Sequence, residues 1–262
     1  MNRIDSKFKE LRAAGKKAFM PFLTAGYPSL PMTGKLILEF EKRGADVIEL
    51  GIPFSDPIAD GPVIQQSSYE AIKNGTTLKK VFGLVRRLRE ETQIPLAAMT
   101  YFNLILNYGP TRFIKDALAA GFDGVIIPDL PPEEEGEFSK EARKKGLKVI
   151  LFMAPTTSRE RAGFIARRAE GFIYFVSLTG VTGARRELPR ELGFQLRAAK
   201  KAAGDIAVCA GFGVSTPQQV KAISAFCDGV IVGSAIVKKI SESIDASDPV
   251  KAVGDFMARL KG

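Results

Sequence analysis

The chain has 262 residues, of which 45% are hydrophobic, and this is enough for one sizeable core. It contains no histidine, which excludes Ser-His-Asp and Cys-His catalysis, HExxH zinc sites and most transition-metal sites, so we expect no metal. The net charge of +9 suggests nucleic-acid binding, but the basic clusters (86–89, 143–145, 167–168 and 200–201) fall on separate predicted helices with acids nearby, and we expect solvated helix faces instead.

The first predicted element is an N-terminal helix over residues 5–14. The opening residues, 1–10, are too polar for a signal peptide, and no apolar run approaches the ~20 residues of a membrane span. Cys209 and Cys227 both lie in apolar runs, as buried thiols in a reducing compartment do. These features predict a soluble, cytoplasmic protein without a membrane association.

Eight short apolar runs then recur along the chain, with amphipathic helical patterns between them. The runs are 18–23, 47–51, 96–100, 124–127, 149–153, 172–177, 206–210 and 229–232. Continuous apolar strands indicate a parallel sheet buried on both faces, and their alternation with helices indicates βαβ units. Eight units in about 250 residues predict a (β/α)8 TIM barrel. A doubly wound open sheet is the alternative, but the Gly-rich dinucleotide turn expected after its first strand is missing.

Apolar residues at helical spacing support the barrel. They are Leu36, Ile37 and Phe40; Val63, Tyr69 and Ile72; Leu78, Val81, Phe82, Val85 and Leu88; Phe113, Ile114 and Leu118; and Phe256 and Leu260 in a closing helix. The N-terminal helix is expected to cover the barrel bottom. No linker divides the chain, so we expect residues 1–262 to form a single domain with added helices.

A carboxylate interrupts the second apolar run. Because side chains alternate along a strand, Val47, Glu49 and Gly51 share one face, and Glu49 near the C-terminal end should face the barrel mouth. Asp60 follows in a loop rich in Pro and Gly. Glu49 could be a satisfied structural acid, and Asp60 could cap the next helix. A buried carboxyl with a partner on a loop is also an arrangement for proton transfer, and these residues alone leave the choice open.

Glycines after the last two runs point to an anion. Gly211, Phe212 and Gly213 follow run seven, while Gly233 and Ser234 follow run eight and open a helix. They could be tight turns. Loops at these two positions are, however, the usual phosphate site of barrels, where backbone N–H groups and a helix N-terminus meet the anion. Because glycines occur in both loops, we favour a phosphate-binding site over simple tight turns.

No lysine lies in the C-terminal half of a predicted strand, since Lys148 enters run five from the bottom. A Schiff-base aldolase mechanism is therefore unsupported, and the lack of histidine disfavours a metal aldolase. Cofactor-free acid–base chemistry on a phosphorylated substrate, using Glu49 and Asp60, remains.

Over essentially its full length the chain resembles the alpha subunit of tryptophan synthase. The matching segments are 21–28, 49–62, 99–103, 128–131, 180–183 and 211–215, of which 49–62 is long and highly specific. The resemblance implies cleavage of indole-3-glycerol phosphate to indole and glyceraldehyde 3-phosphate. It implies that Glu49 protonates indole C3 and takes the hydroxyl proton, and that Asp60 stabilises the indoleninium.

The same resemblance implies the remaining site residues. Phe22, Tyr101 and Tyr174 would line the indole pocket, and Gly183, Phe212, Gly213, Gly233 and Ser234 would hold the phosphate. Thr182 matches the threonine of a flexible loop that closes over the site and meets Asp60. Leu178 departs from the arginine of some relatives, which affects the detail of loop closure.

A partner is implied as well. The family works with a beta subunit that holds pyridoxal phosphate and receives indole through a tunnel in an alpha2beta2 complex, so this chain itself would need no cofactor. Segments 53–57 and 128–132 and Asn103 would form the interface. Two alternatives stay open: a stand-alone indole-3-glycerol phosphate lyase, and a non-catalytic activator of a beta subunit, which need not keep the carboxylate pair.

Overall fold

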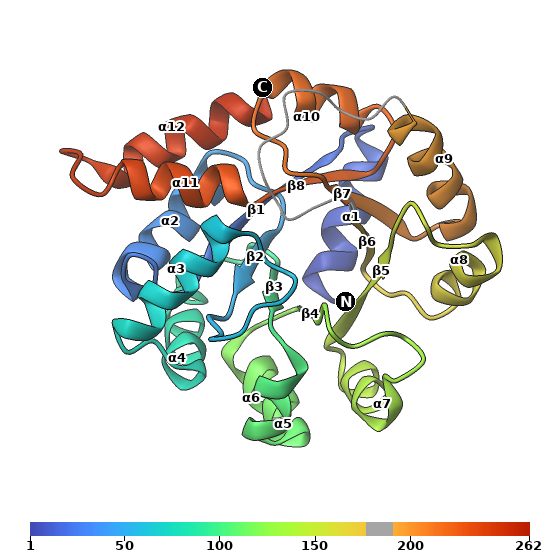
Figure 1. Cartoon of the computed structure of the whole chain (residues 1–262), viewed down its shortest axis with the longest axis horizontal. Coiled ribbons are helices and arrows are strands. Elements are labelled where there is room, and N and C mark those ends of the chain that lie inside the picture. The colour runs from blue at the N-terminus through green and yellow to red at the C-terminus, as the bar shows by residue number, and fades with distance from the viewer. Residues whose placement is uncertain (177–190) are drawn as a thin grey trace.

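Eight parallel strands close into a barrel in which each strand pairs with its neighbours in sequence order and β8 returns to β1 (Figure 1). The computed structural model describes residues 1–176 and 191–262. The strands are β1 Ala18–Thr24, β2 Ile48–Gly51, β3 Leu96–Met99, β4 Gly124–Ile126, β5 Lys148–Met153, β6 Phe172–Val176, β7 Ala207–Gly211 and β8 Gly229–Val232. The predicted TIM barrel is confirmed, and every predicted strand overlaps an observed one.

Helices surround the barrel (Figure 1). They are α1 Arg3–Ala13, α2 Leu30–Lys42, α3 Pro62–Lys73, α4 Leu78–Leu88, α5 Phe102–Tyr108, α6 Pro110–Ala120, α7 Gly136–Lys145, α8 Arg159–Ala166, α9 Leu192–Ala203, α10 Pro217–Ser224, α11 Ser234–Glu242 and α12 Pro249–Lys261. The sequence did not predict α5, whose seven residues follow Tyr101, an N-cap residue whose own side chain makes no capping hydrogen bond. So short a helix has too few turns to show an apolar period.

The expected apolar face of α3 was wrong. Tyr69 and Ile72 are exposed, and the buried face is formed by Ile64, Ser67, Ser68 and Ala71. Small residues on this face let the helix approach β1 closely, and the Ser67 hydroxyl lies 2.6 Å from the Thr24 hydroxyl. Because two of the four inward residues are serines, hydrophobicity alone selects the wrong side of the helix.

The barrel interior is closed from the N-terminal end by α1. Ile4, Phe8 and Leu11 of this helix pack in one cluster with Val47 and other inward residues of the strands, as predicted for a helix covering the barrel bottom. The alternate residues of β2, Ile48 and Leu50, belong to the outer core beneath the helices. The N-terminal end is therefore filled by packing, which leaves the C-terminal end for a site.

One residue of the basic clusters, Arg89, does not lie on a solvated helix face, whereas its neighbours Arg86 and Arg87 are exposed. The Arg89 side chain is 11% exposed and pairs with Asp123 at 3.1 Å. It also donates to the carbonyls of Gly121 and Ile94. Arg89 thus ties the end of α4 to the barrel bottom, a structural role that corrects the expectation for this residue. In the described ranges, no helix has the length and apolarity needed to cross a membrane.

Candidate active site

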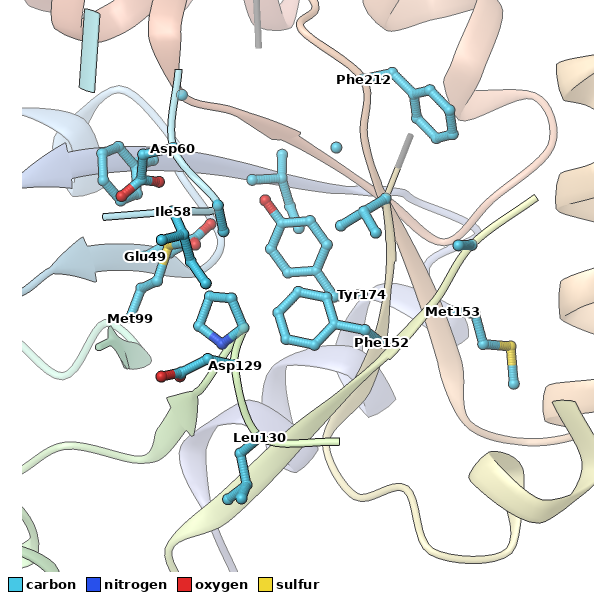
Figure 2. A pocket seen from close by; sticks show the side chains of 18 of the residues that line it. Glu49, Ile58, Asp60, Met99, Asp129, Leu130, Phe152, Met153, Tyr174 and Phe212 are labelled. Atoms are coloured by element: carbon cyan, nitrogen blue, oxygen red, sulfur yellow. The ribbon is translucent and has the colours of Figure 1, made fainter. Parts of the chain in front are cut away.

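A cavity of about 800 Å³ lies at the C-terminal ends of the strands. Figure 2 shows Glu49 and Asp60 on one side of it, with the adjacent rings of Phe152 and Tyr174 facing them. Eight of the nine predicted site residues in the described ranges line it directly: Glu49, Asp60, Phe22, Tyr174, Phe212, Gly213, Gly233 and Ser234, which begins α11. Tyr101 lies behind Asp60, to which it is hydrogen-bonded.

Glu49 is a fully buried acid in the wall of the cavity. It lies on β2 between Phe22 and Ala97 of the neighbouring strands, and it is 1% exposed. Neither of its carboxyl oxygens forms a hydrogen bond within the described residues. Burial, with a further contribution from the charge of Asp60, raises the pKa of Glu49 to about 8, opposed by the nearby Tyr174 hydroxyl. Glu49 is therefore mostly protonated at neutral pH, and its carboxyl group faces the cavity.

Asp60 has a different environment. The Tyr101 hydroxyl donates to Asp60 Oδ2 at 3.1 Å, and it accepts a hydrogen bond from the Ala59 N–H at 3.0 Å. Burial raises the pKa of Asp60 to about 6, and the hydrogen bond from Tyr101 lowers it. At neutral pH Asp60 is therefore mostly ionised while Glu49 is mostly protonated. Two carboxyls held in opposite states are a recurrent basis for dividing acid and base roles.

The helix-cap interpretation of Asp60 is contradicted. Gly61 is the N-cap residue of α3, and no side chain makes a capping hydrogen bond there. The side chain of Asp60 points instead toward the cavity (Figure 2). A capping role therefore does not explain why this loop has a buried carboxylate.

Two glycines make room for the rings that wall the cavity. A Cβ atom at Gly51 would lie 2.5 Å from the Phe22 ring, and one at Gly211 would lie 2.7 Å from the Tyr174 ring. Contacts this short do not occur in folded proteins, so any side chain at either position would displace a ring. Tyr174 is further fixed by Phe152, whose ring centroid lies 5.2 Å away. The two glycines therefore set the shape of the apolar half of the cavity.

A further part of the cavity, which we call the anion seat and which consists of Phe212, Gly213, Gly233 and Ser234, has features that suit an anion. Phe212 and Gly213 follow β7, and Gly233 caps α11, whose first residue is Ser234. Gly213 has a φ of 64°, a left-handed conformation that favours glycine. A Cβ at Gly233 would be in ordinary van der Waals contact with Phe22 at 3.6 Å and Ile64 at 3.7 Å, so this position tolerates a Cβ without a clash. A helix N-terminus, with its aligned N–H groups, stabilises negative charge.

Some site residues were missed, and others cannot be placed. Thr182, Gly183 and Leu178 lie outside the described residues. Phe152, Asp129 and Arg161 line the cavity without having been predicted. Phe152 was detectable, because period-two alternation along β5 puts it on the inward face with Ile150. Arg161 lies on α8, so no strand pattern points to it.

The closed barrel, with two buried carboxyls in the cavity at the C-terminal ends of its strands, is the architecture of a TIM-barrel enzyme. Comparison with known proteins narrows this class. The family model described as tryptophan synthase alpha chain matches residues 8–259, and the chain belongs to this family.

Individual relatives agree. The tryptophan synthase alpha chain of Geobacter sp. (strain M21) is 45% identical over 261 residues, which span 100% of this chain and 97% of that protein. That of Geobacter sulfurreducens is 46% identical over 261 residues. The crystal structure of subunit alpha from Legionella pneumophila str. Paris superposes with a TM-score of 0.91 at 40% identity, covering 99% and 97% of the two chains. A Pyrococcus furiosus tryptophan synthase complex gives a TM-score of 0.84 at 38% identity, covering 93% of this chain and 97% of that one.

Proposed function

We propose that this chain is the carbon–carbon lyase of tryptophan biosynthesis that splits indole-3-glycerol phosphate into indole and glyceraldehyde 3-phosphate. The observation that supports the roles of its residues best is the pair Glu49 and Asp60, two buried carboxyls with different protonation in one cavity. The direct test is release of indole from indole-3-glycerol phosphate by the purified chain.

The proposed mechanism moves one proton from the substrate hydroxyl to the indole ring. Protonated Glu49 gives its proton to indole C3, which turns the ring into an indoleninium cation. The ionised Asp60 accepts the hydrogen bond of the indole N–H and stabilises this cation. The Glu49 carboxylate then takes the proton of the side-chain hydroxyl, an aldehyde forms, and the bond to C3 breaks with its electrons returning to the ring. Because the ring is the electron sink, the step requires no cofactor in this chain.

Phe22 and Tyr174 are proposed to hold the indole, and the backbone at Phe212, Gly213, Gly233 and Ser234 the phosphate. Gly183 and Thr182, which lie outside the described residues, are proposed to contribute to the phosphate site and to contact with Asp60, respectively. The described lining has three carboxyls, Glu49, Asp60 and Asp129, and a single cation, Arg161. Within the described residues, phosphate binding is therefore proposed to use backbone N–H groups and the start of α11.

The pH dependence of turnover follows from the two carboxyls. We expect activity to rise as Asp60 ionises near pH 6 and to fall as Glu49 loses its proton near pH 8. Because the two carboxyls interact, the two limbs of the pH profile give apparent pKa values of the pair and not of either residue alone. Steady-state kcat/KM measured from pH 5 to 9 should give a bell. A plateau that continues to pH 9 would contradict the assignment of Glu49 as the acid.

Phosphate binding is tested at Gly233, where an added Cβ would have no neighbour closer than 3.6 Å. Gly233→Asp should weaken binding of glycerol 3-phosphate by at least about 30-fold, because it puts a negative charge at the helix N-terminus. Gly233→Asn is the matched control, with the same shape and no charge, and should bind far better. Indole binding should change little in either variant. Calorimetry showing equal losses for both variants and both ligands would indicate a general distortion.

A beta subunit is the proposed partner, with pyridoxal phosphate confined to that subunit and an alpha2beta2 assembly. Support comes from exposed apolar residues beside the expected interface: Ile58 is 83% exposed and Leu106 is 53% exposed. Ile58 lies two residues before Asp60, so a partner covering it would restrict the Asp60 loop. The non-catalytic alternative is disfavoured because the site keeps both carboxyls and the anion seat.

We expect a beta subunit to accelerate indole release. We also expect glycerol 3-phosphate, a substrate analogue, to increase the affinity between the two subunits. By linkage, the beta subunit should increase the affinity of this chain for glycerol 3-phosphate by the same factor. Ile58→Ser, on the exposed part of the loop, should weaken the complex, whereas Phe194→Ser on distant α9, where Phe194 is 72% exposed, should not. Titration of the two subunits measures both. An unchanged rate and affinity would favour the stand-alone lyase.

The location and the domain organisation are also proposed. The free buried cysteines support the cytoplasm as the location of the protein. Strand pairing between β1 and β8 supports one domain over residues 1–262.

A further inference from the structure

Asp129 is a carboxylate at the edge of the cavity that the mechanism does not use. It follows β4 in the segment Pro128–Pro132, and it lines the cavity without contacting Glu49 or Asp60 through a hydrogen bond (Figure 2). Its two oxygens both accept from the backbone N–H of Phe102, at 2.9 and 3.1 Å. This pair of hydrogen bonds joins the end of β4 to the first residue of α5.

The peptide that Asp129 holds is the one joining Tyr101 to Phe102. Tyr101 is the residue whose hydroxyl donates to Asp60 Oδ2 and accepts from the Ala59 N–H. Burial raises the pKa of the Tyr101 hydroxyl, so it keeps its proton for Asp60. The Tyr101 ring is also stacked on Phe54, with centroids 5.2 Å apart. The position of the Tyr101 backbone therefore decides where the hydroxyl meets the Asp60 loop.

We propose that Asp129 is a positioning residue that keeps the Tyr101 hydroxyl on Asp60 by holding the Phe102 N–H. The inference rests on the proposed function, in which Asp60 stabilises the cationic ring. Three segments far apart in sequence, the ends of β2, β3 and β4, are connected by this chain of hydrogen bonds. What Asp129 supplies is an acceptor at a fixed place, and its negative charge is not required.

Two aspartate variants separate position from charge. Asp129→Asn keeps an acceptor for the Phe102 N–H and loses the charge, so it should keep kcat within about threefold. Asp129→Ala loses both and should lower kcat by about 30- to 100-fold with KM changed much less, because a misplaced Tyr101 affects the transition state most. Asp116→Ala is the matched control. Asp116 accepts from the Tyr108 hydroxyl at 2.6 Å at the other end of α5, outside the cavity, and its loss should leave kcat unchanged.

A double-mutant cycle tests whether the effect passes through Tyr101. Tyr101→Phe removes the hydroxyl, so adding Asp129→Ala to it should cost less than about twofold more. Both single variants should also move the titration of Asp60 to higher pH, since the hydrogen bond from Tyr101 lowers the pKa of Asp60. The groups facing Asp60 are Glu49, Tyr101 and Tyr174. Carbon-13 NMR of the labelled Asp60 carboxyl reads this shift without any turnover.

Three results would overturn the proposal: equal losses in Asp129→Asn and Asp129→Ala, additive losses in the cycle, or an Asp60 titration that Asp129→Ala leaves in place. A parent chain that releases no indole would refute the proposed function instead. In that case the NMR titration and its Tyr101 dependence still decide whether Asp129 positions Tyr101.

Discussion

Replacing Glu49 by glutamine should remove nearly all lyase activity, with a loss of at least about 1,000-fold in kcat. The glutamine keeps the shape of a side chain that is 1% exposed, so the barrel and the anion seat should remain intact. It cannot give a proton to indole C3 or take one from the hydroxyl. Rate assays show the loss, and calorimetry with glycerol 3-phosphate shows whether the site still binds. Near-normal turnover would refute Glu49 as the acid.

The same variant should gain stability at alkaline pH. Because burial raises the pKa of Glu49 from 4.5 to about 8, the unfolded chain ionises this group at lower pH than the folded chain does. The contribution of Glu49 to the free energy of unfolding therefore falls as pH rises from about 4.5 to about 8. The stability advantage of Glu49→Gln over the parent should be larger at pH 8 than at pH 4 by roughly 4 kcal/mol. Denaturant unfolding at the two pH values measures this difference, and equal differences at both would show that Glu49 ionises normally.

Replacing Asp60 by asparagine is the second large effect. The change keeps size and still accepts a hydrogen bond from Tyr101, but it removes the charge opposite the indoleninium. We expect kcat to fall by about 100- to 1,000-fold, as losses of transition-state electrostatics do. The fold should not suffer, because Gly61 and not Asp60 caps α3. Full activity in Asp60→Asn, measured in the steady state at pH 7, would exclude the electrostatic role.

A matched variant on the same loop separates charge from general disturbance. Asp56→Asn removes an exposed carboxylate four residues away, and its hydrogen bond is local, to Ser55. In the isolated chain it should leave turnover within about twofold of the parent, because a surface charge outside the cavity contributes little. If both variants lost the same activity, the loop as a whole would be responsible.

The sequence predicted the parts of this molecule that follow a regular period. Eight apolar runs gave the strands, and alternation placed Val47 and Glu49 on the inner face, as the structure confirms. The helices with broad apolar faces were found in the same way. The face of α3 was misplaced because Ser67 and Ser68 are buried and Tyr69 is exposed, a case in which tertiary packing overrides hydrophobicity.

The site was predictable where residue types are unusual for their element, as with a glutamate in a buried strand and paired glycines before a helix. It was not predictable where contacts between distant segments decide. No local sequence pattern shows that Gly51 packs against the Phe22 ring or that Gly211 packs against the Tyr174 ring. Nor does any local pattern show that the Phe102 N–H donates to Asp129. Each of these relations depends on strand neighbours in the closed barrel.

The most direct test of the central claim is simultaneous measurement of both products from indole-3-glycerol phosphate. The purified chain, alone and with a beta subunit, is incubated with substrate at pH 7, and indole and glyceraldehyde 3-phosphate are quantified over time. We predict that the two appear in equal amounts, that the beta subunit accelerates both, and that Glu49→Gln releases neither. Release of neither product by the parent chain in the presence of a beta subunit would contradict the proposed lyase.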